Sequence, residues 1–207
     1  MCCDGCLGSI GSRLWCSLAG GFMRLLWGQT VVAVTLLSGG LAAAQSQSAQ
    51  VPVTHGTTFA GTQVTLPNDL HGRTGVLVLG FSKSSGDVSK GWGERLSATY
   101  RGSQEVMYFQ MPVLESVPKL VRGMVVKSIK SGVPESEQSH FMPMFSDEPV
   151  WKKIVRYANA DDAYVLVVDG DGKVRWQTSG KVSDAGFVML KEQVAALQAQ
   201  SATLSAK

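Results

Sequence analysis

The stretch Val76-Leu77-Val78-Leu79-Gly80-Phe81 decides the fold of this 207-residue chain. It is an unbroken apolar run, the pattern of a strand that is buried on both faces of a sheet. A strand covered on both faces needs packed elements above and below it. We therefore expect a central strand in a layered domain.

The segments on either side of this run alternate between helical and extended patterns. They are an extended segment over 63–67, a helix with Asp87 as its N-cap, a strand over 105–113, a helix over 116–131, a short helix from Pro149, hairpin strands over 164–168 and 173–178, and a last helix from Asp184. Strands linked through helices run parallel, whereas a hairpin is antiparallel. The order predicts an α/β fold, a three-layer sandwich in which a mixed central sheet has helices on both faces.

The turn Asp169-Gly170-Asp171-Gly172 has two interpretations. Asp-Gly steps between apolar runs are typical of a tight hairpin turn. Alternating acids with a glycine also begin a calcium-binding EF-hand loop, but the twelfth position of such a loop requires a bidentate Glu and is Gly180 here. The hairpin is favoured, and we expect no metal site.

Composition indicates one folded domain and disfavours nucleic acid as a partner. The chain is 44% hydrophobic and only 17% charged, which suffices for one buried core. A formal net charge of +3 lacks the concentration of Lys and Arg that phosphate backbones attract.

The N-terminal residues 1–44 are predicted to be a signal peptide. Arg24 supplies a positive start, Val31 to Leu37 an apolar segment, and Ala42-Ala43-Ala44 the small residues of a cleavage site near Ala44. The apolar run is too short to span a bilayer, so we expect no transmembrane helix in the mature chain. The predicted location is periplasmic or secreted, with Met23 as the true translation start.

All four cysteines precede the predicted cleavage site. Cys2, Cys3, Cys6 and Cys16 could suggest a metal cluster, but no matching His or second cysteine pair follows at ligand spacing. The mature chain would then have neither a disulfide nor a thiol nucleophile. Residues 45–57 are rich in Ser, Gln and Ala and predict a flexible linker, followed by a domain over 58–200 and a disordered tail over 201–207.

The element order, together with residues 66–73 leading into the central strand, resembles the thioredoxin-like superfamily over about residues 58–198. Redox members carry a Cys-x-x-Cys pair at the start of the helix that follows this strand. That place reads Ser82-Lys83-Ser84-Ser85 here, a vestigial active-site region, and the expected cis-proline is replaced by Ala163 and its neighbours. We therefore expect no catalytic residue, no cofactor, and neither thiol-disulfide oxidoreductase nor thiol peroxidase activity.

Residues 163–180 carry a closer match. Their Leu-Val-Asp-type strand, tight turn, basic-Trp pair and following glycine resemble the mitochondrial ATPase assembly factor ten family, with Asp169, Arg175, Trp176 and Gly180 as the shared motif. The resemblance implies a thioredoxin-like protein without a redox pair that helps to assemble the membrane sector of F-type ATP synthase. Trp176 is also expected to be buried beside Tyr164 on the hairpin.

Two surfaces are candidates for partner binding. Lys119, Arg122, Lys127 and Lys130 form a basic side opposite the apolar stripe of the helix over 116–131, which is either simply solvated or docks acidic lipid headgroups or an acidic partner. The apolar loop containing His140, Phe141, Met142, Met144 and Phe145 either contacts a partner or covers the core.

The leading hypothesis from the sequence is an exported, redox-inactive binding or assembly protein that meets a protein partner at the membrane surface. The alternative is an enzyme that binds a thiol ligand such as glutathione through the Ser84 hydroxyl at the helix start. This alternative rests on fold analogy.

Overall fold

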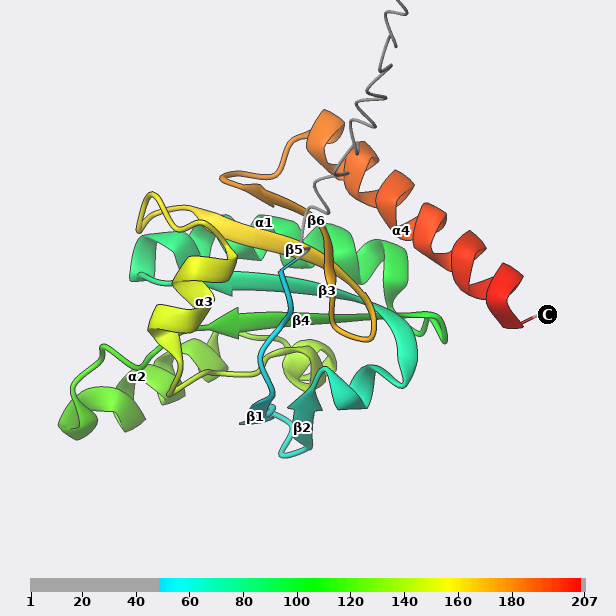
Figure 1. Ribbon diagram of the computed structural model, residues 1–207. Helices are drawn as coiled ribbons and strands as arrows, with labels where there is room; N and C mark the ends of the chain where they lie inside the picture. The colour runs from blue at the N-terminus through cyan, green and yellow to red at the C-terminus, as the bar shows by residue number, and fades with distance from the viewer. Residues whose placement is uncertain (1–48, 206–207) are drawn as a thin grey trace, which may run out of the picture. The chain divides into compact units, whose positions relative to one another are not determined.

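A computed structural model describes residues 49–205 (Figure 1), so the predicted signal peptide and the start at Met23 lie outside the described residues. Its central sheet has the strand order β4-β3-β5-β6. These strands are β3 (Gly72–Gly80), β4 (Val106–Pro112), β5 (Ala163–Gly170) and β6 (Val174–Ser179). β3 runs parallel to β4 and antiparallel to β5, and β6 is antiparallel to β5, which confirms the mixed sheet.

Helices cover both faces of this sheet. α1 (Lys83–Tyr100) and α4 (Asp184–Ser205) lie on one face, and α3 (Glu148–Ile154) lies on the other (Figure 1). Side chains alternate along a strand, so Val76 and Val78 of β3 face α1 and α4 while Leu77 and Leu79 face α3. The three-layer sandwich is confirmed.

Each face has its own core. Trp92 and Leu96 of α1 pack with the apolar face of α4 on one side of the sheet. Trp151 of α3 and Val155 after it pack on the other side, as their spacing predicts. Val150, next to Trp151 in the same helix, is exposed. No helix within residues 49–205 is both long and apolar enough to cross a membrane.

The ordered domain begins earlier and ends later than the sequence indicates. β1 (Thr54–Thr57) pairs with β2 (Gln63–Leu66), and Val51 is buried while its amide donates to the Gly172 carbonyl. The predicted linker over 45–57 is therefore wrong for its described residues from 49 onward. The predicted tail over 201–207 is likewise helical as far as Ser205.

Helix α1 begins five residues before the predicted position. Ser82, not Asp87, is its N-cap: the Ser82 hydroxyl accepts a hydrogen bond from the Ser85 amide, and the Ser85 hydroxyl accepts one from the Ser82 amide. This reciprocal pair is a capping box, which satisfies backbone donors that the first helical turn leaves free.

Helix α2 (Lys119–Ser131) stands apart from the three layers (Figure 1). None of its residues is buried, although apolar residues recur along it at helical spacing. Leu120 is 99% exposed and Met124 is 74% exposed. The 3-10 helices η1 (Asn68–Leu70) and η2 (Glu135–His140) complete the described elements.

Candidate functional site

A groove of about 1220 Å³ lies between α1 and α2, beyond the ends of β3 and β4. Ser82 and Lys83, in the predicted vestigial active-site region at the start of α1, line it. Its floor consists of the last residues of β4 and those that follow, Gln110, Met111, Pro112, Val113 and Leu114. Ligand sites in α/β folds are commonly found beyond the carboxyl ends of strands.

The α1 wall of the groove contains a row of small residues beside longer charged ones. Gly86, Ser89, Gly93 and Ser97 all line it and recur at three- and four-residue spacing on one helix face. A Cβ atom at Gly93 would lie 2.2 Å from Nε2 of Gln110. Gly93 is therefore required where the α1 backbone approaches the Gln110 amide.

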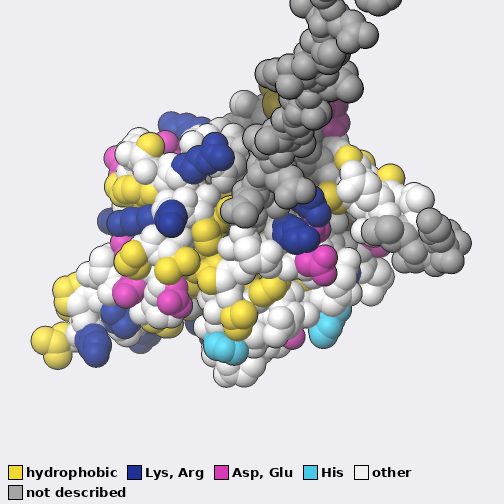
Figure 2. Space-filling model, in the orientation of Figure 1, with side chains coloured by type: hydrophobic (Ala, Val, Ile, Leu, Met, Phe, Trp, Pro, Cys, Tyr) yellow, Lys and Arg dark blue, Asp and Glu magenta, His cyan; other side chains and the backbone are white. Residues whose placement is uncertain are grey.

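The α2 wall is apolar and continues onto the open surface. Val117, Met124, Val125 and Ile129 line the groove, and Leu120 lies one turn before Met124. Figure 2 shows hydrophobic and basic side chains side by side at the end of the molecule formed by α2, at the lower left. Exposed apolar surface beside a concave site is typical of protein-binding regions.

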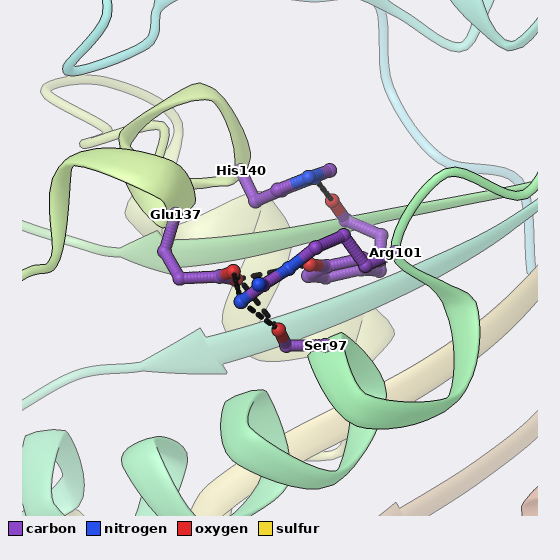
Figure 3. A network of polar contacts seen from close by, with 5 residues as sticks. Ser97, Arg101, Glu137 and His140 are labelled. Carbon is purple, nitrogen blue, oxygen red and sulfur yellow. Dashed lines mark hydrogen bonds and ion pairs between the residues drawn. The ribbon is translucent and has the colours of Figure 1, made fainter.

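A buried polar network closes one end of the groove (Figure 3). Glu137 of η2 is only 8% exposed and accepts hydrogen bonds from the Ser97 hydroxyl and the Tyr108 hydroxyl, each at 2.9 Å. Arg101 forms an ion pair with the same carboxylate. The His140 ring stacks on the Tyr108 ring with centroids 3.9 Å apart, and its Nδ1 lies 3.1 Å from the Tyr108 carbonyl oxygen. The network joins η2 to α1 and β4.

These contacts keep Glu137 ionised. Burial alone would raise the pKa of Glu137, but the hydrogen bonds from Ser97, Tyr108 and Arg101 outweigh it and hold this pKa below the ordinary value of 4.5. Burial, together with the hydrogen bond to Glu137, raises the pKa of Tyr108 to about 12. The tyrosine is therefore a neutral donor to a charged acceptor at neutral pH.

The lowered pKa of Glu137 predicts acid-sensitive stability. A carboxyl group whose pKa is lower in the folded state stabilises the fold fully above its unfolded value of 4.5, and this contribution is lost as pH falls through the folded-state pKa. We expect the urea midpoint of the wild type to fall more steeply between about pH 5 and about pH 3 than that of Glu137→Gln. Equal slopes for the two proteins would contradict the network as described.

Comparison with known proteins identifies the family. The model of the ATP10 protein family matches residues 40–197. The chain belongs to the ATP10 protein family. The match includes the central strand, the groove and the hairpin motif, and it confirms the resemblance inferred from residues 163–180. A direct comparison with curated protein sequences found no match.

Solved structures confirm the thioredoxin-like fold of this ATP10 family member. A protein assigned as the thiol:disulfide interchange protein DsbE from Chlorobium tepidum has a TM-score of 0.52 at 16% identity, covering 73% of this chain and 96% of its own. A protein assigned as a disulfide isomerase from Bacteroides thetaiotaomicron has a TM-score of 0.51 at 17% identity, covering 72% and 88%. BsSco, of the Sco family of cytochrome c oxidase assembly proteins, has a TM-score of 0.50 at 15% identity, covering 73% and 95%. At these identities the likeness concerns the fold alone.

The residues predicted as a shared motif lie in the hairpin and directly after it. The Asp169 carboxylate accepts hydrogen bonds from the amides of Asp171 and Lys173 and forms an ion pair with Arg175. Gly180 has a φ of 93°, and its carbonyl accepts a 2.9 Å hydrogen bond from Trp92 Nε1. Within residues 49–205 no three His, Cys, Asp or Glu side chains converge on a possible metal position.

Trp176 differs from its predicted place. It pairs with Val167 and packs, half-buried, on the α1 and α4 face of the sheet. Tyr164 belongs to the opposite face, because it is an odd number of residues from Val167 and side chains alternate along β5. The prediction that the two rings lie side by side is wrong.

The vestigial region is structural at two of its four positions. Ser82 and Ser85 form the capping box of α1, and the Ser82 hydroxyl also donates to Asp161 Oδ1 at 3.3 Å. Lys83 lines the groove. Ser84 is exposed and is not part of the groove lining.

Two methionines of the loop after η2 cover the core. Met142 and Met144 are buried, and their amides donate to the carbonyls of Gln110 and Pro112, extending the edge of the sheet beside β4. The prediction of these two methionines as partner-binding residues is wrong, because their backbone pairing turns the side chains into the core. Phe141 lines the groove and Phe145 remains exposed.

The basic side of α2 divides into two pairs. Arg122 donates to the carbonyls of Glu115 and Val117 and lies over the Phe145 ring at 5.3 Å, and Lys130 Nζ donates to the Phe59 carbonyl. Lys119 and Lys127 are exposed and have no ion pair among the residues that the structure describes. These two cations remain available beside the groove.

Three residues of the site escaped the sequence analysis: Gln110, Gly93 and Glu137. Gln110 and Glu137 are polar residues buried by segments distant in sequence, which local patterns do not reveal. The glycines of α1 carry a usable signal, since Gly costs about 1 kcal/mol relative to Ala inside a helix. Glycines kept at such a cost on one helix face indicate a close approach.

Proposed function

We propose that this protein is an exported, redox-inactive assembly factor that holds a protein partner in the groove between α1 and α2 at the membrane surface, and thereby aids assembly of ATP synthase. Membership of the ATP10 protein family supports the assembly role. The observation that carries the proposal is the uncovered apolar face of α2, with Leu120 and Met124, beside an open groove.

The energetic argument concerns α2. A surface helix in a globular protein normally buries its apolar stripe against the core, and α2 buries none of its residues. A partner that covers the α2 stripe would remove this apolar surface from water, which stabilises the complex by roughly 25 cal/mol per Å². The groove therefore favours a partner with an apolar face of its own.

Redox inactivity follows from the chemistry of serine. Every cysteine of the chain lies at or before Cys16, and Ser82 to Ser85 stand where the fold carries its redox pair. A hydroxyl does not ionise near neutral pH and forms no disulfide. The purified domain, starting at Gln45, is expected to reduce insulin disulfides no faster than buffer; turnover above buffer with contaminating thioredoxin excluded would overturn this part of the proposal.

Export is supported by the sequence of residues 1–44, with Arg24, the apolar run and the alanines before Gln45. It places the groove outside the cytoplasm, where membrane-complex subunits are accessible from the outer face. We expect a variant in which a single Met replaces residues 1–44 to stay in the cytoplasm. This variant should lose the assembly function although it keeps the whole folded domain.

Complementation tests the proposal. We expect deletion of the gene to lower the amount of assembled ATP synthase on native gels, and the full chain to restore it. Met124→Glu is expected to restore far less, since a charge in an apolar interface weakens binding on the order of tenfold or more. Met189→Glu is the matched control, because Met189 is an exposed methionine on α4, outside the groove.

Two results would contradict the proposed function. One is a normal amount of ATP synthase in the deletion strain. The other is equal restoration by Met124→Glu and by the wild type, with both proteins present at the same level.

A further inference from the structure

We infer that the outer side of α2 docks on an anionic lipid bilayer, with Leu120 in the acyl-chain region and Lys119 and Lys127 at the headgroups. This inference rests on the proposed function and deepens it, because it names what α2 meets at the membrane surface. It is carried by a projecting apolar side chain, by the free cations beside it and by the convex shape of the helix.

The outer side of α2 begins with Leu120. Among the large apolar side chains of residues 49–205, that of Leu120 is the most exposed. Met124 follows it by one turn of the helix and is also exposed, and Val121 is exposed beside the pair. Contiguous exposed apolar side chains are typical of contact sites with a protein or a membrane.

This outer side is distinct from the side of α2 that lines the groove. Val125 and Ile129 line the groove and are half-buried, whereas Leu120 is outside the groove lining. Leu120 precedes Ile129 by nine residues, which places it on roughly the opposite side of a helix with 3.6 residues per turn. A partner confined to the groove therefore leaves Leu120 for a second surface.

Free cations flank Leu120. Lys119 directly precedes it, and Lys127 follows it by about two turns on the same side of α2. Both lysines are exposed, and neither forms an ion pair with another residue of the range 49–205. Helices that lie in an anionic membrane interface have this arrangement, because the long lysine side chains reach the headgroups while the apolar residue enters the acyl region.

The acidic residues nearest the start of α2 do not cancel this charge. α2 itself contains no acidic residue. Glu148 forms an ion pair with Lys152 at 2.7 Å. Glu115 is turned toward α3, since its carboxylate accepts a hydrogen bond from the Glu148 amide. The charge beside Leu120 is therefore positive, which attracts anionic headgroups.

A bilayer fits the outer side of α2 better than a second protein partner does. α2 stands apart from the three layers (Figure 1), so its outer side is convex. A protein that covers a projecting helix needs a matching hollow, whereas a fluid bilayer needs none. The 13 residues of α2 span about 20 Å, less than a hydrocarbon core of about 30 Å, so the helix lies along the interface.

Vesicle flotation tests the inference with the purified domain that starts at Gln45. This domain contains the whole described fold with both of its cores, and it lacks residues 1–44, whose apolar run would confound lipid binding. Vesicles of phosphatidylcholine alone are compared with vesicles that also contain phosphatidylglycerol. We expect binding to the anionic vesicles to be stronger on the order of tenfold or more, because each lysine near an anionic surface contributes about fivefold.

Two pairs of variants locate the contact on α2. Leu120→Glu is expected to weaken binding to the anionic vesicles on the order of tenfold or more, because the inserted side chain is lost. Val188→Glu is its matched control, since Val188 is an exposed apolar residue on α4. Lys127→Gln should weaken binding about fivefold. Lys173→Gln, at an exposed position in the turn between β5 and β6, should bind like the wild type.

Three results would overturn the inference. They are no flotation with either kind of vesicle, equal binding to both kinds, and equal binding by Leu120→Glu and the wild type. Leu120 is almost fully exposed, so its substitution leaves the fold intact, and the comparison of the two vesicles needs no variant. If Leu120 docks on a protein instead, Leu120→Glu lowers the restored ATP synthase although the wild-type domain does not float.

The two proposals fail separately. Flotation with anionic vesicles together with a normal amount of ATP synthase in the deletion strain would contradict the proposed function alone. Loss of ATP synthase in that strain without any vesicle binding would contradict this inference alone.

Discussion

Trp92→Ala is expected to lower the free energy of unfolding by about 3–5 kcal/mol, the range for buried large aromatic residues. Trp92 is 1% exposed and packs against Leu96, Phe187 and other residues between α1 and α4. Its Nε1 also donates to the Gly180 carbonyl, which joins α1 to the end of β6. The substitution therefore leaves both a cavity and an unsatisfied carbonyl.

Urea denaturation monitored by circular dichroism measures this change, with Trp176→Ala as the matched control. Trp176 packs half-buried on the same face of the sheet, and none of the hydrogen bonds of the described residues involves its ring nitrogen. We expect a smaller loss there, about 1–2 kcal/mol, since less apolar surface is removed. Equal losses for the two variants would contradict the packing described for Trp92.

Glu137→Ala is expected to destabilise the fold by about 2–4 kcal/mol. The substitution removes the acceptor of the Ser97 and Tyr108 hydroxyls and the partner of Arg101. Leaving buried donors unsatisfied costs about 1–3 kcal/mol each, although Arg101 is half exposed and can turn to water. The loss should appear as a lower urea midpoint with little change in the slope of the transition.

Glu135→Ala is the control for this change, since Glu135 lies on the same 3-10 helix and is exposed. Exposed substitutions usually stay within about 0.5 kcal/mol. A Glu137→Ala midpoint within that margin of the Glu135→Ala midpoint would show that the network is not energetically important.

The layers of the fold were predictable from local pattern. The apolar run over 76–81 forms most of β3, and the Asp-Gly turn joins β5 to β6. Both β3 and β5 are buried on both faces of the sheet, as unbroken apolar runs predict. Short-range capping was less predictable. Asp87 and Ser82 are both good N-caps by residue type, and the reciprocal hydrogen bond with Ser85 decides between them.

The site depended on information that the local sequence lacks. The helix over 116–131 has an ordinary amphipathic pattern, and this pattern does not indicate that its apolar side stays uncovered. The opposite error occurred at Met142 and Met144, which resemble an exposed adaptable patch until their backbone pairs with β4. In both cases burial depends on whether a segment distant in sequence covers the side chain. Gln110 and Glu137 were missed for the same reason.

Site-specific photocrosslinking in living cells tests the central claim most directly. A photoreactive phenylalanine analogue would replace Met124 on α2 or, as control, Met189 on α4; both side chains are exposed and only Met124 lines the groove. We predict that the probe at position 124 forms an adduct with a subunit of ATP synthase and that the probe at position 189 does not. Absence of that adduct at position 124, or an equal yield at both positions, would contradict the account of a partner held between α1 and α2.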